Sequence, residues 1–278
     1  MHLKLIQNSP ALLLEEGTRR VLIVGDLHIG YERTLFKQEY YSSNIGTRII
    51  KEFEQLVADI EPSEVIILGD LKHSIRNFST QEFQQIAQLL AHLQQQAAVT
   101  IIRGNHDADL DLVIPDNTQL ISAAGFSLKF KSRQIYLLHG HAIPSAEILS
   151  CDSLIMGHIH PAISISQMKN KFTTHRVWVK TNWKPTIIDA VKNWIGEDTF
   201  QNPEVEQQFL QMNILVIPAY LNLLRGHILN EDSPTAHLGT PLFRHLSLDD
   251  AEIVMLDHTP LGTLKELKKE KDKHKETF

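Results

Sequence analysis

The stretch Val99-Thr100-Ile101-Ile102-Arg103-Gly104-Asn105-His106-Asp107 joins an apolar run to a short polar loop. A β-branched run that ends near a glycine is typical of a buried strand that breaks into a tight loop. This loop presents Asn105, His106 and Asp107 at the end of the strand, where open α/β sheets hold their ligand-binding groups. The stretch therefore predicts a functional loop at one edge of a sheet.

Four other apolar runs end in the same way, before glycine, aspartate or histidine. They are residues 21–24, 65–68, 135–138 and 154–156, which precede Gly25-Asp26-Leu27-His28, Gly69-Asp70, His139-Gly140-His141 and Gly157-His158-Ile159-His160. Because side chains alternate along a strand, Asp26 and His28 are expected to point to the same side. The sequence therefore predicts five strands whose ends share one kind of chemistry.

The candidate metal ligands offer carboxylate and amide oxygens and imidazole nitrogens, without thiolate. They are Asp26, His28, Asp70, Asn105, His139, His158 and His160. This mixed set suits Mn first, and also Fe, Zn, Co or Ni, better than Ca, which prefers oxygen ligands. Asp70 could bridge two cations, and metal pairs about 3.5–4 Å apart recur in phosphoester hydrolysis. We therefore expect two divalent metal ions and a hydrolase.

In chain order, these motifs resemble those of the calcineurin-like metallophosphoesterase superfamily. The motifs are Asp26-Leu27-His28, Gly69-Asp70, Gly104-Asn105-His106-Asp107, His139 and Gly157-His158-Ile159-His160. The resemblance implies that one metal is held by Asp26, His28, Asp70 and His160, and the other by Asp70, Asn105, His139 and His158. A hydroxide between the metals would attack phosphorus. His106 would be the catalytic residue, stabilising the charged transition state or protonating the leaving oxygen.

Three segments are similar to the SbcD-related, PdeM-like phosphoesterases of archaea and bacteria: residues 25–32, 69–73 and 217–220. This resemblance implies a phosphodiester substrate, DNA or RNA, and DNA-repair partners such as a helicase or ligase. One position departs from the superfamily, because many members have an aspartate where this chain has His73. A histidine cannot supply the same negative charge to orient the catalytic imidazole. Lys72 and His73 could instead contact the substrate phosphate.

Three other polar residues near the motifs allow two interpretations each. Arg103 is either a substrate contact or part of a surface salt bridge. His141, two residues after His139, is either a substrate contact or a support for neighbouring ligands. Asp107 either orients a loop residue or caps the turn that follows it.

Size and composition favour one globular domain in a reducing compartment. The chain has 278 residues, 42% of them hydrophobic, and a net charge of −6, which argues against a protein wrapped in nucleic acid. The single cysteine, Cys151, excludes an intramolecular disulfide and a thiolate-rich zinc finger. The first residues lack the order of a signal peptide, and the apolar stretch 214–224 is too short to span a membrane. We expect a cytoplasmic protein without a membrane partner.

The expected fold is α/β, with two packed mixed β-sheets flanked by helices. Strands at 20–24, 65–68 and 99–102 are joined by helices at 45–60 and from the capping residue Ser79 to 93, which indicates a parallel first sheet. A mostly antiparallel second sheet is expected from the segments 119–121, 126–130, 135–138, 154–156, 163–165, 175–179, 214–217 and 252–256. We expect a single domain over residues 1–264, an insertion at 182–209 forming a surface helix and loop, a turn at 257–262, and a charged tail at 265–278.

The leading functional hypothesis is a metal-dependent phosphodiesterase, specifically a DNA or RNA nuclease linked to DNA repair. The alternative is a small-molecule phosphatase or cyclic-nucleotide phosphodiesterase, which the negative net charge favours. A third hypothesis, an inactive scaffold that binds partners, is opposed by the presence of His106 and of every candidate ligand.

Overall fold

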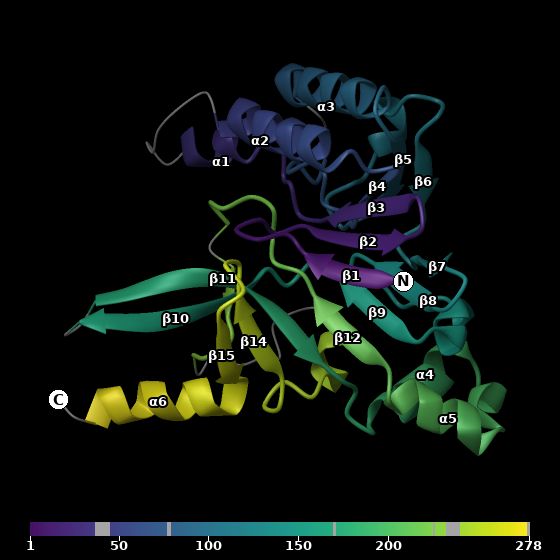
Figure 1. Cartoon of the computed structure of the whole chain (residues 1–278), viewed down its shortest axis with the longest axis vertical. Helices are drawn as coiled ribbons and strands as arrows, with labels where there is room; N and C mark the ends of the chain where they lie inside the picture. The colour runs from purple at the N-terminus through teal and green to yellow at the C-terminus, as the bar shows by residue number, and fades with distance from the viewer. Residues whose placement is uncertain (37–44, 77–78, 169–170, 225, 232–239, 277–278) are drawn as a thin grey trace.

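Two β-sheets pack face to face at the centre of the molecule, and helices cover their outer faces (Figure 1). The computed structural model describes residues 1–36, 45–76, 79–168, 171–224, 226–231 and 240–276. The predicted α/β fold with two packed mixed sheets is confirmed.

The first sheet has six strands in the order β1-β2-β3-β4-β5-β6. Their bounds are β1 His2–Leu5, β2 Leu12–Glu16, β3 Arg19–Val24, β4 Glu64–Ile67, β5 Ala98–Ile102 and β6 Gln119–Ile121. Strands β3, β4 and β5 are parallel, as predicted, and β6 continues the parallel arrangement, whereas β1 and β2 are antiparallel to their neighbours. The assignment of 119–121 to the second sheet is wrong, because β6 pairs with β5. Three residues are too few for a pattern that shows which sheet they join.

Two long helices cover the outer face of the first sheet. The helices of this half are α1 Glu32–Phe36, α2 Ile45–Ile60 and α3 Thr80–Leu93. Apolar side chains of α2 and α3, such as Phe53 and Leu90, pack against Leu22 and Val65 of the sheet. The capping box is confirmed: the Ser79 hydroxyl accepts from the backbone N–H of Glu82, whose carboxylate accepts from the backbone N–H of Ser79.

The second sheet has nine strands, seven of them in the order β13-β10-β11-β12-β9-β8-β7, with β14 beside β11 and β15 beside β14. Their bounds are β7 Phe126–Lys129, β8 Gln134–Leu138, β9 Ser153–Met156, β10 Pro161–Met168, β11 Lys171–Thr181, β12 Asn213–Val216, β13 His227–Ile228, β14 Glu252–Met255 and β15 Pro260–Thr263. The expected antiparallel pairing is found between β7 and β8 and around β11 and β14, but β8, β9 and β12 are parallel to one another and β13 is parallel to β10. Residues 163–165 and 175–179 are parts of a longer hairpin of β10 and β11, whose pairing extends beyond both segments.

Two expectations for the second half are wrong. Residues 182–209 form two helices, α4 Ile187–Ile195 and α5 Pro203–Leu210, rather than one helix and a loop. Their apolar side chains, including Val191 and Phe209, pack beneath the second sheet with Cys151, which is buried and free. The expected turn at 257–262 overlaps strand β15, because Pro260 and Thr263 pair with Val254 and Glu252 of β14. The charged tail is helical, as α6 Leu264–Glu276.

A middle apolar layer holds the sheets together. Ile23, Ile66 and Ile102 of the first sheet meet Leu137 and Ile155 of the second. Neighbouring residues on β3, β4 and β5 face the helices instead, so each strand is buried on both faces and reads as a continuous apolar run. The loops that follow β3, β4, β5, β8 and β9 consequently gather where the two sheets meet.

No helix in the described ranges has the length and apolar character needed to cross a membrane.

Candidate metal centre

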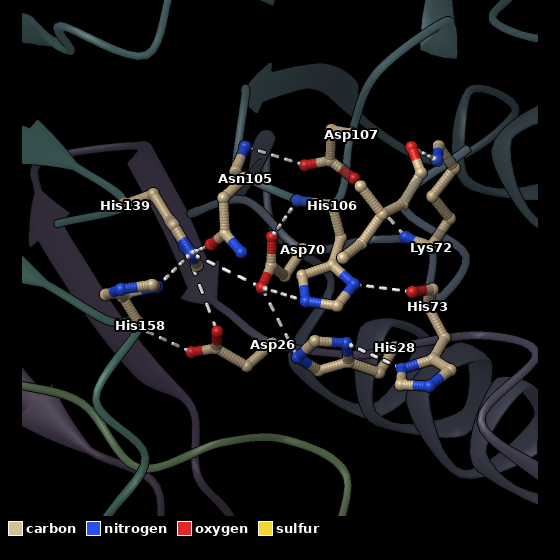
Figure 2. Close-up of polar contacts among 12 residues, drawn as sticks. Asp26, His28, Asp70, Lys72, His73, Asn105, His106, Asp107, His139 and His158 are labelled. Carbon is tan, nitrogen blue, oxygen red and sulfur yellow. Dashed lines mark hydrogen bonds and ion pairs between the residues drawn. The ribbon is translucent and has the colours of Figure 1, made fainter. Parts of the chain in front are cut away.

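Five loops, each following a parallel strand, bring the predicted ligands together (Figure 2). Their side chains form two groups in which the ligand atoms of each group all lie within 4.8 Å of one another. The groups are Asp26, His28, Asp70 and His160, and Asp70, His139 and His158. Asp70 belongs to both groups, which is the place expected for a carboxylate between two cations.

One oxygen of Asp70 faces both groups equally. Asp70 Oδ2 lies 3.4 Å from His28 Nε2 and 3.4 Å from His139 Nε2. Its other oxygen, Oδ1, accepts a hydrogen bond of 2.9 Å from the backbone N–H of His106. Only 2% of Asp70 is exposed. The carboxylate is therefore fixed before any ion binds.

The remaining ligand atoms converge from opposite sides of Asp70. In the first group, His160 Nε2 lies 3.0 Å from Asp26 Oδ1 and 3.4 Å from His28 Nε2. In the second, His139 Nε2 lies 3.0 Å from His158 Nδ1 and 3.2 Å from the amide oxygen of Asn105. Asn105 thus joins the second group, and all seven predicted residues meet at one place.

The backbone is unusual at the candidate ligands. Nine non-glycine residues in the described ranges have positive φ, and five of them are candidate ligands. These are Asp26 at 58°, His28 at 45°, Asp70 at 50°, His158 at 72° and His160 at 45°. A left-handed residue with a side chain costs about 1–2 kcal/mol, and such residues cluster where function requires a fixed geometry. The expected reason for pairing Asp26 with His28 is wrong: both follow the end of β3, and a curled loop rather than strand alternation brings them together.

The charges of the cluster suit a divalent cation. Burial opposes ionisation of Asp26 and Asp70, but His160 beside Asp26 and His139 beside Asp70 outweigh it and lower both pKa values. Burial lowers the pKa of His28 to about 3 and that of His158 to about 4. These residues are therefore carboxylates and neutral imidazoles near neutral pH, the forms that bind metal.

His139 is held in the orientation that a ligand needs. Its Nδ1–H donates to the carbonyl oxygen of Leu68 at 2.7 Å, which turns Nε2 toward Asp70. Burial opposes protonation of His139, but its hydrogen bond with Asp70 outweighs this and raises its pKa to about 9. A cation that binds here must therefore displace a proton. Two divalent ions fit the donor set, the carboxylate of Asp70 that both groups share, and the orientation of the His139 ring in the second group.

His106 lies beside the cluster and is oriented by a backbone carbonyl. Its Nδ1–H donates to the carbonyl oxygen of His73, and its Nε2 is 4.0 Å from Asp70 Oδ2. The backbone of His73 therefore supplies an acceptor, although its side chain is not a carboxylate. The His73 ring itself lies between His28, with Nδ1 atoms 3.3 Å apart, and Thr34, whose Oγ1 is 3.0 Å from Nε2. Both ring nitrogens have protein partners, so the ring braces His28.

The other predicted substrate contacts differ in where they point. The Lys72 ammonium is buried and donates to the carbonyl oxygens of Ser74 and Ile75. Arg103 donates to the carbonyl of Asp107 and pairs with Asp111, so the salt-bridge interpretation is the one observed. These two cations hold loops together.

His141, in contrast, packs directly against the candidate ligands. Its ring lies 5.3 Å from that of His139 and 5.8 Å from that of His158. Its Nδ1 is buried without a hydrogen-bond partner in the described part of the chain. His141 therefore stays a candidate substrate contact.

Asp107 joins two of the ligand-bearing loops. Its Oδ2 accepts from the backbone N–H of Gly104 at 2.8 Å and its Oδ1 from that of Lys72 at 3.3 Å. Asp107 thus orients loop residues, the first of its two interpretations, because both N–H groups that its carboxylate binds in the described part of the chain precede it in the sequence. Burial raises the pKa of this carboxyl to about 6.

Replacing Asp107 with alanine is expected to lower the free energy of unfolding by about 2–4 kcal/mol, because two buried N–H groups lose their acceptor. Urea unfolding monitored by circular dichroism measures this loss. Asp111→Ala is the matched control, because Asp111 is 62% exposed and its removal is expected to change stability little. Equal stability of the two variants would contradict the bridging role of Asp107.

Two polar residues behind the cluster were not predicted from the sequence. Thr34 contacts the ring of His73, and the carboxylate of Glu82 accepts from the backbone N–H groups of His73 and Ser74. In the sequence, Glu82 is recognisable only as the partner of Ser79 in the capping box. No motif shows that the same carboxylate also reaches a neighbouring loop.

Comparison with known proteins gives one family match. The model of the family described as calcineurin-like phosphoesterase matches residues 19–231, a range that includes every candidate ligand. No curated protein matches the chain.

Solved structures also resemble the chain. Nuclease MPE of Pseudomonas putida has a TM-score of 0.49 and 15% identity, covering 94% of this chain and 100% of that one. The phosphoesterase YfcE of E. coli has a TM-score of 0.34 and 18% identity, covering 53% of this chain and 74% of that one. A Vps29 double mutant of Entamoeba histolytica has a TM-score of 0.28 and 17% identity, with coverages of 55% and 71%.

Proposed function

The chain belongs to the calcineurin-like phosphoesterase family, and from this premise we propose that it hydrolyses phosphodiester bonds at a centre of two divalent metal ions. The observation that carries the proposal is the place of Asp70 Oδ2, 3.4 Å from a ring nitrogen in each of two ligand groups. One ion would be held by Asp26, His28, Asp70 and His160, and the other by Asp70, Asn105, His139 and His158. Manganese is the first candidate, followed by Fe, Zn, Co or Ni.

The metal ligands and His106 have different roles in the proposed hydrolysis. Two bound cations would supply Lewis acidity and a water molecule of lowered pKa. The ligands hold their orientation through backbone contacts such as that of His139 with Leu68. His106 is the catalytic residue in this proposal. With Nδ1 bound to the carbonyl of His73, its Nε2 is the atom that donates to a phosphoryl or leaving oxygen.

The proposed substrate is DNA or RNA, in a repair role beside a helicase or ligase in the cytoplasm. This part of the proposal rests on the three segments that are similar to SbcD-related, PdeM-like phosphoesterases. The segments lie together: the backbone N–H of Ile29 donates to the carbonyl of Leu71 at 2.9 Å, and that of Tyr220 to the carbonyl of Gly25 at 3.0 Å. Their similarity therefore concerns one connected region that contains Asp26, His28 and Asp70.

A small-molecule phosphatase or cyclic-nucleotide phosphodiesterase is the second candidate, favoured by the net charge of −6. A strongly anionic polymer is attracted less by such a chain than by a basic one. The two candidates differ in the substrate that the same metal centre accepts.

A metal and substrate panel tests these proposals. After chelation, the protein is expected to lose activity and to regain it with Mn²⁺ and, to differing extents, with Fe²⁺, Zn²⁺, Co²⁺ or Ni²⁺. The restored enzyme is assayed with bis-p-nitrophenyl phosphate, p-nitrophenyl phosphate, a cyclic nucleotide and end-labelled DNA and RNA oligonucleotides. Cleavage of the diester and of an oligonucleotide is expected. Failure to cleave any oligonucleotide with any of these metals would retire the nuclease, and preferential hydrolysis of the monoester or cyclic nucleotide would support the second candidate.

A further inference from the structure

The carboxylate of Glu82 lies completely buried in the first turn of α3, behind the metal centre. Its Oε1 accepts from the backbone N–H of His73 at 3.2 Å and from that of Ser74 at 2.9 Å. Its Oε2 accepts from the hydroxyl of Ser74 at 2.7 Å. Three donors from one dipeptide therefore converge on one ionisable side chain, which is more than helix capping requires.

The peptide held in this way is also the peptide that orients His106. The N–H of Ser74 and the carbonyl of His73 belong to the same planar trans unit, in which the two groups point in opposite directions. When Glu82 fixes the N–H on one side, it fixes the direction of the carbonyl on the other. That carbonyl accepts from His106 Nδ1. Glu82 and His106 thus lie at the two ends of one rigid unit.

Neighbouring groups keep the Glu82 carboxylate in place. The loop that carries His28 passes directly over it at Gly30, where an added Cβ would lie 2.9 Å from Glu82 Cδ. Gly30 also has a φ of +96°, a conformation that side chains rarely adopt. On the far side of the same dipeptide, the Lys72 ammonium donates to the carbonyl of Ser74. The dipeptide is held from two sides, with little freedom to turn.

We infer that Glu82 is a positioning residue for hydrolysis, acting on His106 through the peptide between His73 and Ser74. This inference rests on the proposed function of the metal centre. A hydrogen bond to a carboxylate polarises the peptide, so its carbonyl becomes a stronger acceptor. The Glu82 carboxylate thereby increases the negative partial charge on the carbonyl oxygen that accepts from His106, at a site where the side chain of His73 offers no carboxylate.

The capping box supplies a matched pair of variants. Glu82→Gln removes the negative charge and leaves one acceptor oxygen for the three donors of the loop, with an amide NH2 group in place of the other oxygen. Ser79→Ala removes the capping hydroxyl, which accepts from the Glu82 N–H at 3.1 Å, but leaves the loop contacts of Glu82 intact. Both variants weaken the start of α3, and only the first disturbs the path to His106.

The kinetic test uses Mn²⁺-loaded protein and aryl phosphodiesters of graded leaving-group pKa. Glu82→Gln is expected to lower kcat about 10–100-fold for poor leaving groups, and less for p-nitrophenolate, which needs little proton transfer. Ser79→Ala is expected to retain the kcat and leaving-group dependence of the wild type. Calorimetric titration with Mn²⁺ is expected to give wild-type affinity for both variants. A leaving-group dependence in Glu82→Gln that differs from that of His106→Ala, or the same loss in Ser79→Ala, would overturn the inference.

A double-mutant cycle tests whether Glu82 acts through His106. Because Glu82 acts through His106, Glu82→Gln is expected to cause no further loss in a His106→Ala background. Equal losses in both backgrounds would overturn the inference. If Glu82→Gln fails to fold, Ser74→Ala replaces it, because it removes one of the three donors, and about a threefold loss that vanishes without His106 is expected.

Nitrogen-15 NMR of the His106 ring separates this inference from the proposed function. The Nδ1–H resonance is expected to shift in Glu82→Gln, or in its replacement Ser74→Ala, and to stay in place in Ser79→Ala. Wild-type protein that hydrolyses no substrate would refute the proposed function, while an unshifted Nδ1–H resonance would refute the role of Glu82.

Discussion

Alanine in place of Asp70 is expected to abolish hydrolysis and to weaken the binding of divalent cations more than a hundredfold, beyond the about 10–100-fold typical of residues that only support ligands. Removing the carboxylate takes away the one oxygen that faces His28 Nε2 and His139 Nε2 at 3.4 Å each. Without Asp70, the two ligand groups no longer have a negatively charged ligand in common. Calorimetric titration with Mn²⁺, together with the bis-p-nitrophenyl phosphate assay, measures both effects.

Two further variants make the Asp70 experiment specific. Asp70→Asn keeps the shape and one carbonyl oxygen but loses the charge, and is expected to retain weak binding at no more than one of the sites. Asp111→Ala, on an exposed carboxylate paired with Arg103, is expected to bind two equivalents with wild-type affinity. Binding of two Mn²⁺ ions by Asp70→Ala with unchanged affinity would show that the cluster is not a shared two-metal centre.

The convergence of Asp26, Asp70 and Asn105 was predictable because it depends on topology. Each follows a strand of the parallel first sheet, and the ends of parallel strands meet at one edge of a sheet. For ligands such as His158, which follow strands expected in a mostly antiparallel sheet, the sequence indicates the convergence only through the family resemblance. It does not predict their left-handed backbones, because φ is set by the path of each loop.

Other features depend on contacts that leave no periodic pattern. The orientation of Lys72 is one such feature, because its ammonium points inward and donates to the carbonyl oxygens of Ser74 and Ile75. The sequence pattern around a lysine beside a catalytic motif is the same whether the side chain faces a phosphate or its own loop. The predictions for the segments of β6 and β15 are wrong because, in such short segments, pairing partners decide the structure more than composition does.

The carbonyl of His73 explains how this chain orients a histidine without an aspartate at that position. Its acceptor belongs to the backbone, so its direction depends on whatever fixes the peptide, and the observed contacts assign that task to Glu82. A sequence comparison of side chains alone would record His73 only as a missing carboxylate. The charge lies instead nine residues further along the chain, on a helix.

Removing the imidazole of His106 is expected to lower kcat about 10²–10⁴-fold, the range typical of general acid–base groups, while Mn²⁺ binding stays at the wild-type level. The reason for unchanged binding is specific to this site. The contact that His106 makes with Asp70 Oδ1 comes from its backbone N–H, at 2.9 Å, and alanine retains that donor. His106→Ala therefore removes the ring without releasing the shared carboxylate.

The leaving group distinguishes the two roles open to this ring. If His106 Nε2 gives a proton to the leaving oxygen, the loss in His106→Ala grows as the leaving group becomes more basic, and p-nitrophenolate esters are the least affected. If the ring only stabilises charge on the phosphoryl oxygens, the loss is the same for every leaving group. The carbonyl acceptor at Nδ1 leaves Nε2 as the ring atom available to the leaving oxygen, so we expect the graded response. Unchanged kcat with every ester would remove His106 from the mechanism.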